Sequence, residues 1–157
     1  MSKREIEDYL STHAFFSEMD KSFVEFLSDT VTELQINRGD VLFQQGKPAD
    51  KFYLLRKGQV SVQVPALMGP TLDIQTLVED QILGWSWLIP PYRWSFQARA
   101  LEDSDLLEFD GSAILARCEE DSRFGYELFK RFAALMSERL DAARQKMMDE
   151  WNPPGFA

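Results

Sequence analysis

The spacing of apolar residues divides the chain into a helical start, a strand-rich middle and a helical end. Within residues 1–29 the apolar positions recur at intervals of three and four, which places them on one face of an α-helix. Within residues 30–110 the period changes to two, as in half-buried strands, and turns such as Arg38-Gly39-Asp40 and Gly46-Lys47-Pro48 separate the runs. Many short strands with such turns predict a small barrel or jelly roll, so the expected fold class is α+β.

Residues 111–150 are predicted to form helices, and the last of these helices is long. From Ser122 onward the apolar residues follow helical spacing, and the first proline after it is Pro153. Roughly 28 residues at about 1.5 Å each span about 42 Å, which is more than the width of a small barrel. We therefore expect part of the apolar face to pair with a second copy in a homodimer, the alternative being a helix that bends back over its own barrel. The side chains predicted at this interface are Phe129, Phe132, Met136, Leu140, Ala143 and Met147.

The last seven residues, WNPPGFA, are predicted to form a flexible tail, because their prolines end the long helix. A frayed terminus is the default expectation for such a segment. Trp151 and Phe156 support a sharper hypothesis, in which the tail is a docking peptide, since aromatic side chains are costly to leave in solvent.

Composition and charge narrow the range of functions. The chain has 157 residues, 45% of them hydrophobic, which fits one globular domain, and its net charge of -9 leaves no broad basic surface for nucleic acid or an anionic membrane. The charged N-terminus is unlike a signal peptide, and no window approaches the roughly 20 apolar residues of a membrane span, so we expect a cytoplasmic protein. His13 and Cys118 are too few to build a metal site, and the acidic residues after Cys118 disfavour a reactive thiolate. Without a catalytic or cofactor motif, we expect no enzyme activity, catalytic residue, metal or cofactor.

Three stretches of the sequence match a known family pattern: NRGDVLFQQGKPADKFYLLRKGQVSVQV at 37–64, QILGWSWL at 81–88 and ARALEDSDLLEFD at 98–110. They resemble the cyclic-nucleotide-binding domain of catabolite-activator and FNR-like regulators. The resemblance implies an eight-stranded jelly roll, a short phosphate-cradling helix after Gly84, and a C-terminal helix that dimerises or couples to an output domain. Only seven residues follow Glu150, so we expect no DNA-binding winged helix after this domain.

The resemblance also implies two ligand-binding side chains, and this sequence departs from the family at both. A carboxylate should follow the cradle glycine to bind the ribose hydroxyl, but the family's Phe-Gly-Glu reads Leu83-Gly84-Trp85 here, and an indole offers no acceptor. An arginine should bind the cyclic phosphate, but that position falls on Trp94, and Arg93 is one residue earlier, on the opposite face of a strand. These departures argue against ordinary cyclic AMP binding, unless an irregular backbone near Pro90-Pro91 turns Arg93 inward.

Two functional hypotheses follow from the altered pocket. The first is a regulatory or assembly module with a degenerate nucleotide site, which acts by contacting another, unidentified protein. The second is a sensor that binds cyclic nucleotide or another small ligand in an altered aromatic pocket, where aromatic side chains often anchor ligands. The alternative for Trp85 and Trp94 is that their rings are core residues that fill the former nucleotide pocket. The predicted pocket residues are Leu83, Gly84, Trp85, Ser86, Trp87, Arg93, Trp94 and Ser95.

Overall fold

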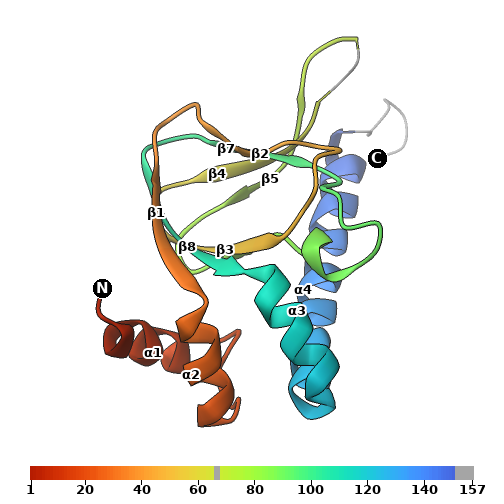
Figure 1. Ribbon diagram of the computed structural model, residues 1–157. Helices are drawn as coiled ribbons and strands as arrows, with labels where there is room; N and C mark the ends of the chain where they lie inside the picture. Colours follow the sequence, from red (N-terminus) through yellow and green to blue (C-terminus); the bar gives the residue numbers. More distant parts are fainter. Residues whose placement is uncertain (66–67, 151–157) are drawn as a thin grey trace.

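The fold is a jelly roll of two sheets with helices at both ends of the chain (Figure 1). The computed structural model describes residues 1–65 and 68–150, so the predicted docking residues Trp151 and Phe156 lie outside the described part. The predicted α+β class, with eight strands and a long C-terminal helix, is confirmed. In chain order the elements are α1 (Lys3–Thr12), α2 (Lys21–Asp29), β1 (Val31–Ile36), β2 (Val41–Phe43), β3 (Lys51–Lys57), β4 (Val60–Val64), β5 (Leu72–Leu77), β6 (Ile82–Leu83), the 3-10 helix η1 (Ser86–Leu88), β7 (Gln97–Ala100), β8 (Ser104–Asp110), α3 (Gly111–Glu120) and α4 (Ser122–Glu150).

The strands form two four-stranded antiparallel sheets, with the orders β1-β8-β3-β6 and β2-β7-β4-β5. In the first sheet the inner strands β3 and β8 place Phe52 opposite Phe109 and Leu54 opposite Leu107, and all four side chains are buried. Cross-strand pairs of large apolar side chains of this kind fix the register of a sheet. The sequence predicted the last two strands at residues 96–101 and 105–109, close to the observed β7 and β8.

Side-chain caps define where three of the helices begin. The Ser2 hydroxyl accepts from the backbone N–H of Glu5 ahead of α1, and the Asp110 carboxylate accepts from that of Ala113 ahead of α3. Before α4, the Asp121 carboxylate accepts from the backbone N–H groups of two residues in the first turn. Each cap satisfies backbone donors that have no partner within the helix.

An aromatic cluster joins the first sheet, η1 and α4. Phe52 stacks on Phe109 with ring centroids 4.3 Å apart, and Trp87 stacks on Phe52 at 5.1 Å. Phe132 of α4 meets Phe52 and Trp87 edge-on, at 5.2 and 5.4 Å. Phe132 was predicted at an intermolecular interface and Trp87 in the pocket, but both side chains are buried in this core, because the helical stripe that carries Phe132 packs on its own chain.

Helix α4 begins beside α3, below the sheets, and its later turns run along the side of the jelly roll (Figure 1). Its first half packs against the core through Phe124, Leu128, Phe132 and Leu135, all buried. Its second half passes over a pocket, and near its end Met147 is 65% exposed. Within residues 1–65 and 68–150, no helix is both long and apolar enough to cross a membrane.

Candidate functional site

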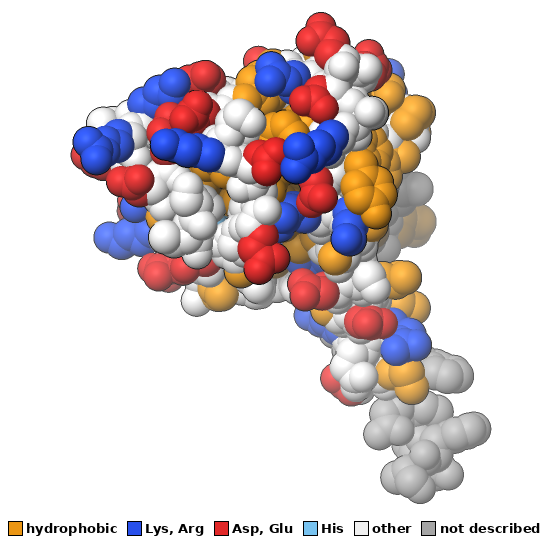
Figure 2. Space-filling model, turned by 90° about the horizontal axis from the view of Figure 1, so that it is seen from below, with side chains coloured by type: hydrophobic (Ala, Val, Ile, Leu, Met, Phe, Trp, Pro, Cys, Tyr) orange, Lys and Arg blue, Asp and Glu red, His pale blue; other side chains and the backbone are white. Residues whose placement is uncertain are grey.

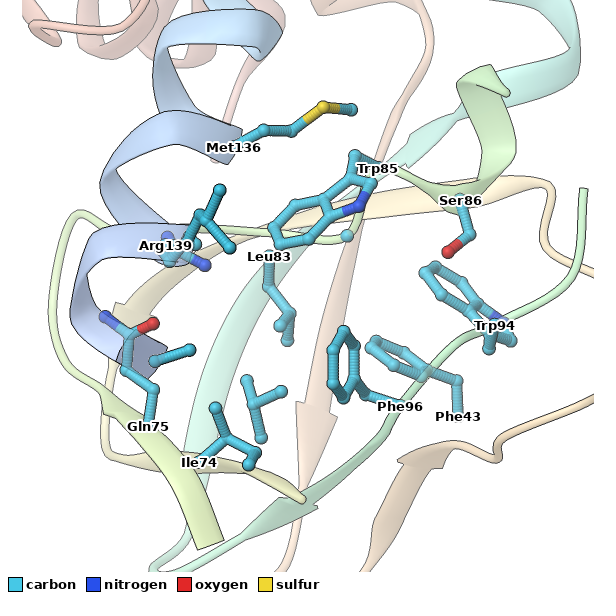
Figure 3. A pocket seen from close by; sticks show the side chains of 14 residues that line it. Phe43, Ile74, Gln75, Leu83, Trp85, Ser86, Trp94, Phe96, Met136 and Arg139 are labelled. Carbon is cyan, nitrogen blue, oxygen red and sulfur yellow. The ribbon is translucent and has the colours of Figure 1, made fainter. Parts of the chain in front are cut away.

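A cavity of about 160 Å³ lies between the jelly roll and α4 (Figure 3). The second sheet and the turn after β6 form one wall, and α4 forms the other. The lining is mostly apolar and aromatic, and none of the described residues that line it is acidic. These residues are Phe43, Val62, Ile74, Gln75, Leu83, Gly84, Trp85, Ser86, Trp94, Phe96, Met136, Arg139, Leu140 and Ala143.

The turn after β6 brings three of the predicted pocket residues together. Gly84 has a φ of 100°, a left-handed conformation that favours glycine, and the short helix η1 follows two residues later, as the family resemblance implies. The indole N–H of Trp87 donates to the Gly84 carbonyl at 3.2 Å and so ties the turn to the buried core. Trp85 and Ser86 then face the cavity.

The ring of Trp94 covers the turn at Gly84. Its side chain is buried and stacks on Phe43, with ring centroids 3.7 Å apart and planes 10° from parallel. A Cβ added to Gly84 would lie 3.0 Å from two carbons of the Trp94 ring. The main chain of Trp94 is held by two backbone hydrogen bonds, from the N–H of Gly46 at 2.8 Å and to the carbonyl of Lys47 at 3.0 Å.

Arg93 points away from the cavity, because residue 93 faces the opposite side from Trp94. Its guanidinium is exposed and donates to the Gly46 carbonyl at 2.9 Å. Ser95 is also exposed, and neither residue lines the cavity. Of the eight predicted pocket residues, the structure therefore brings together Leu83, Gly84, Trp85, Ser86 and Trp94, and leaves out Trp87, Arg93 and Ser95.

Trp85 stands in the middle of the pocket. Figure 3 shows its indole between Arg139 and Gln75 on one side and Ser86 and Trp94 on the other. The side chain is only half-buried, so part of the indole remains accessible. At the position where the family resemblance implies a carboxylate, this pocket presents an aromatic face and an N–H donor.

Arg139 is a pocket residue that the sequence reading missed. Its side chain extends from α4 to the cavity wall, is 9% exposed, and donates to the Ile82 carbonyl at the end of the first sheet. Burial lowers the pKa of the guanidinium to about 10, although the neighbouring Glu138 acts in the opposite direction. Arg139 therefore stays positively charged at neutral pH. Its spacing along the helix could have identified it. Leu135, Met136 and Ala143 lie three or four residues from Arg139, which places all four residues on the same face of α4.

The architecture is that of a two-sheet jelly roll with a pocket bordered by a long C-terminal helix. Residues 33–121, more than half of the chain, match the family model of the cyclic nucleotide-binding domain. The chain belongs to the cyclic nucleotide-binding domain family. No curated protein matches the chain in sequence.

Several solved structures share this fold. A cyclic nucleotide-binding domain from Methylobacillus flagellatus is 17% identical, with a TM-score of 0.78 over 98% of this chain and 86% of that chain. The sensor domain of the transcriptional regulator DNR from Pseudomonas aeruginosa is 20% identical, with a TM-score of 0.72 over 88% of this chain and 93% of that chain. The catabolite activator protein from Thermus thermophilus is 24% identical, with a TM-score of 0.67 over 85% of this chain and 61% of that chain. At these identities the likeness concerns the fold alone.

Proposed function

We propose that this chain is a regulatory domain that no longer binds cyclic nucleotide in the manner of its family, and that it acts through contacts with another protein. The position of Trp94 carries the proposal, because its ring lies on Gly84 and stacks on Phe43 beside the turn that would hold a phosphate. A ring packed this closely on Gly84 narrows the space for a phosphate on that side of the turn.

The missing polar groups support the same proposal. Trp85 offers no acceptor for a ribose hydroxyl, and Arg93 donates to a surface carbonyl instead of facing the pocket. A hydrogen bond to a charged group contributes about 1.5 to 3 kcal/mol, which corresponds to roughly 10- to 150-fold in affinity. Losing both contacts therefore removes most of the specific affinity for a cyclic nucleotide.

The exposed apolar side chains of α4 support contact with a protein. Tyr126 is 65% exposed, Phe129 43%, Leu140 70% and Met147 65%, and large apolar side chains exposed along one element are typical of interaction surfaces. The face drawn in Figure 2 carries acidic and basic side chains interspersed, without a continuous basic patch that would favour nucleic acid. We propose that α4 supplies both a homodimer contact and the contact with the regulated protein.

Calorimetric titration of the purified protein with cyclic AMP and cyclic GMP tests the proposal. We expect no saturable heat up to about 1 mM of either nucleotide. Binding with a micromolar Kd that is lost in Arg93→Ala would refute the proposal, since that arginine would then reach the ligand. Arg99→Ala is the matched control, because the Arg99 guanidinium donates to a glycine carbonyl in the same way, at 2.8 Å from that of Gly39.

A second candidate function is small-molecule sensing, and the remaining cavity favours it. About 160 Å³ of space persists beside Trp85, and α4 lines it through Met136, Leu140 and Ala143. A ligand in this space would touch the same helix that carries the exposed apolar residues. Under this candidate the domain still fails to bind cyclic nucleotide, but it responds to another compound.

A further inference from the structure

The cavity wall contains one positive charge that forms no ion pair within the described part of the chain. Arg139 is nine-tenths buried, and in the described part of the chain its one hydrogen bond goes to the Ile82 carbonyl and no carboxylate lies within ion-pair distance of it. A guanidinium has five N–H donors, so most of its capacity remains unused. Burying a charge without a counter-ion is costly, and a charge held at a cavity wall in this way is suited to an anion.

The rest of the cavity is built for an apolar body. Beyond Arg139, its surface comes mainly from aromatic and aliphatic side chains such as Trp85, Leu83 and Phe96. Gln75 lies beside Arg139 in Figure 3 and adds an amide group at the same end of the pocket. An apolar protein cavity of about 150 Å³ holds a benzene molecule, so the volume of about 160 Å³ fits one ring or a short branched chain.

We propose that this pocket binds a small carboxylate with an apolar body of about one ring, its carboxylate on Arg139 and its ring against Trp85. This proposal rests on the proposed function, in which the pocket no longer binds cyclic nucleotide. A carboxylate matches the planar fork of a guanidinium through two parallel hydrogen bonds. The geometry also selects against a phosphate monoester, because its second negative charge would remain unpaired in an apolar site.

Calorimetric titration of the full chain with phenylacetate tests this proposal. We expect saturable binding with a Kd below about 1 mM, and weaker binding of phenyl phosphate and of the uncharged benzyl alcohol. Arg139→Gln should weaken phenylacetate binding by about 10- to 100-fold and leave benzyl alcohol binding unchanged. Arg144→Gln is the matched control on the same helix, because the Arg144 side chain is 73% exposed, and it should have no effect.

A second variant keeps the test decisive if Arg139→Gln does not fold. Ala143→Phe places a ring in the cavity and keeps the arginine, so it should abolish phenylacetate binding while circular dichroism remains that of the unaltered protein. The proposal is overturned if phenylacetate gives no saturable heat up to about 10 mM, or if either pocket variant binds it as the unaltered chain does. Absence of phenylacetate binding together with absence of cyclic nucleotide binding overturns this inference alone. Binding of cyclic AMP that depends on Arg93 overturns the proposed function.

Discussion

Replacing Trp94 by alanine tests whether its indole is a structural part of the pocket wall. The ring is 7% exposed and stacks on Phe43 at 3.7 Å. Removing a buried tryptophan side chain leaves a cavity and typically lowers the free energy of unfolding by about 3–5 kcal/mol, of which about 0.5–1.5 kcal/mol belongs to aromatic stacking. We expect a loss of about 3–4 kcal/mol for Trp94→Ala, and a smaller loss of roughly 1–2 kcal/mol for Trp94→Phe, which keeps a ring on Phe43.

The close approach of the ring to Gly84 makes this prediction sharper. Alanine at position 84 has to adopt a φ of 100°, a left-handed conformation that costs about 1–2 kcal/mol. Its Cβ would also lie 3.0 Å from the Trp94 ring, which adds steric strain. In the Trp94→Ala background that contact is gone, so Gly84→Ala should cost only the backbone strain. The two substitutions should therefore be non-additive.

Urea unfolding followed by circular dichroism gives the free energies of unfolding of the single and double variants. Met68→Ala is the control, because the Met68 side chain is 93% exposed and lies outside α4, so its removal should cost no more than about 0.5 kcal/mol. A loss below about 1 kcal/mol for Trp94→Ala, or additive costs for the two substitutions, would refute the packing of the indole on Gly84.

Two further predictions concern the thiol and the long helix. Burial raises the pKa of the Cys118 thiol to about 11, and Glu119 and Asp121 add to the increase, so at pH 7 the thiolate fraction should be about 300-fold below that of a peptide cysteine. Iodoacetamide labelling should accordingly be slow at pH 7 and accelerate up to about pH 11, and labelling at the peptide rate would contradict this. If α4 forms the homodimer, light scattering should give twice the 18.2 kDa chain mass, and Met147→Glu should halve it, because a charge would enter the apolar contact. Met68→Glu is the control outside α4, since Met68 is 93% exposed, and a dimer that survives Met147→Glu would remove that residue from the interface.

The sequence predicts the jelly roll well because alternation and turns report directly on strands. Glycines at positive φ, among them Gly39, Gly46 and Gly58, lie in the turns that the sequence marked as strand boundaries. The start of the long helix at Ser122 was likewise readable, because Asp121 provides a cap before a run of helical spacing. These features are local, so a single sequence contains them.

The pocket is less readable because its walls come from segments far apart in the chain. The one-residue offset between Arg93 and Trp94 predicts that the two side chains face opposite sides, but the predicted pocket included both residues, and only Trp94 lines the cavity. The apolar stripe of α4 did not reveal what covers it, so Phe132 was assigned to a partner although its own core buries it. Arg139 escaped notice because a charged residue on an amphipathic helix usually belongs to the solvent face.

Helix α4 is one unbroken element from the aromatic core, past the cavity, to its end at Glu150. Met147 follows Leu140 by about two helical turns, and the ladder of backbone hydrogen bonds between them contains no proline or glycine that would act as a hinge. If the middle of a straight helix tilts, its far end moves by a distance that grows with the length of helix beyond the tilt. A ligand beside Trp85 that displaced the middle of α4 would therefore also displace the turns around Met147.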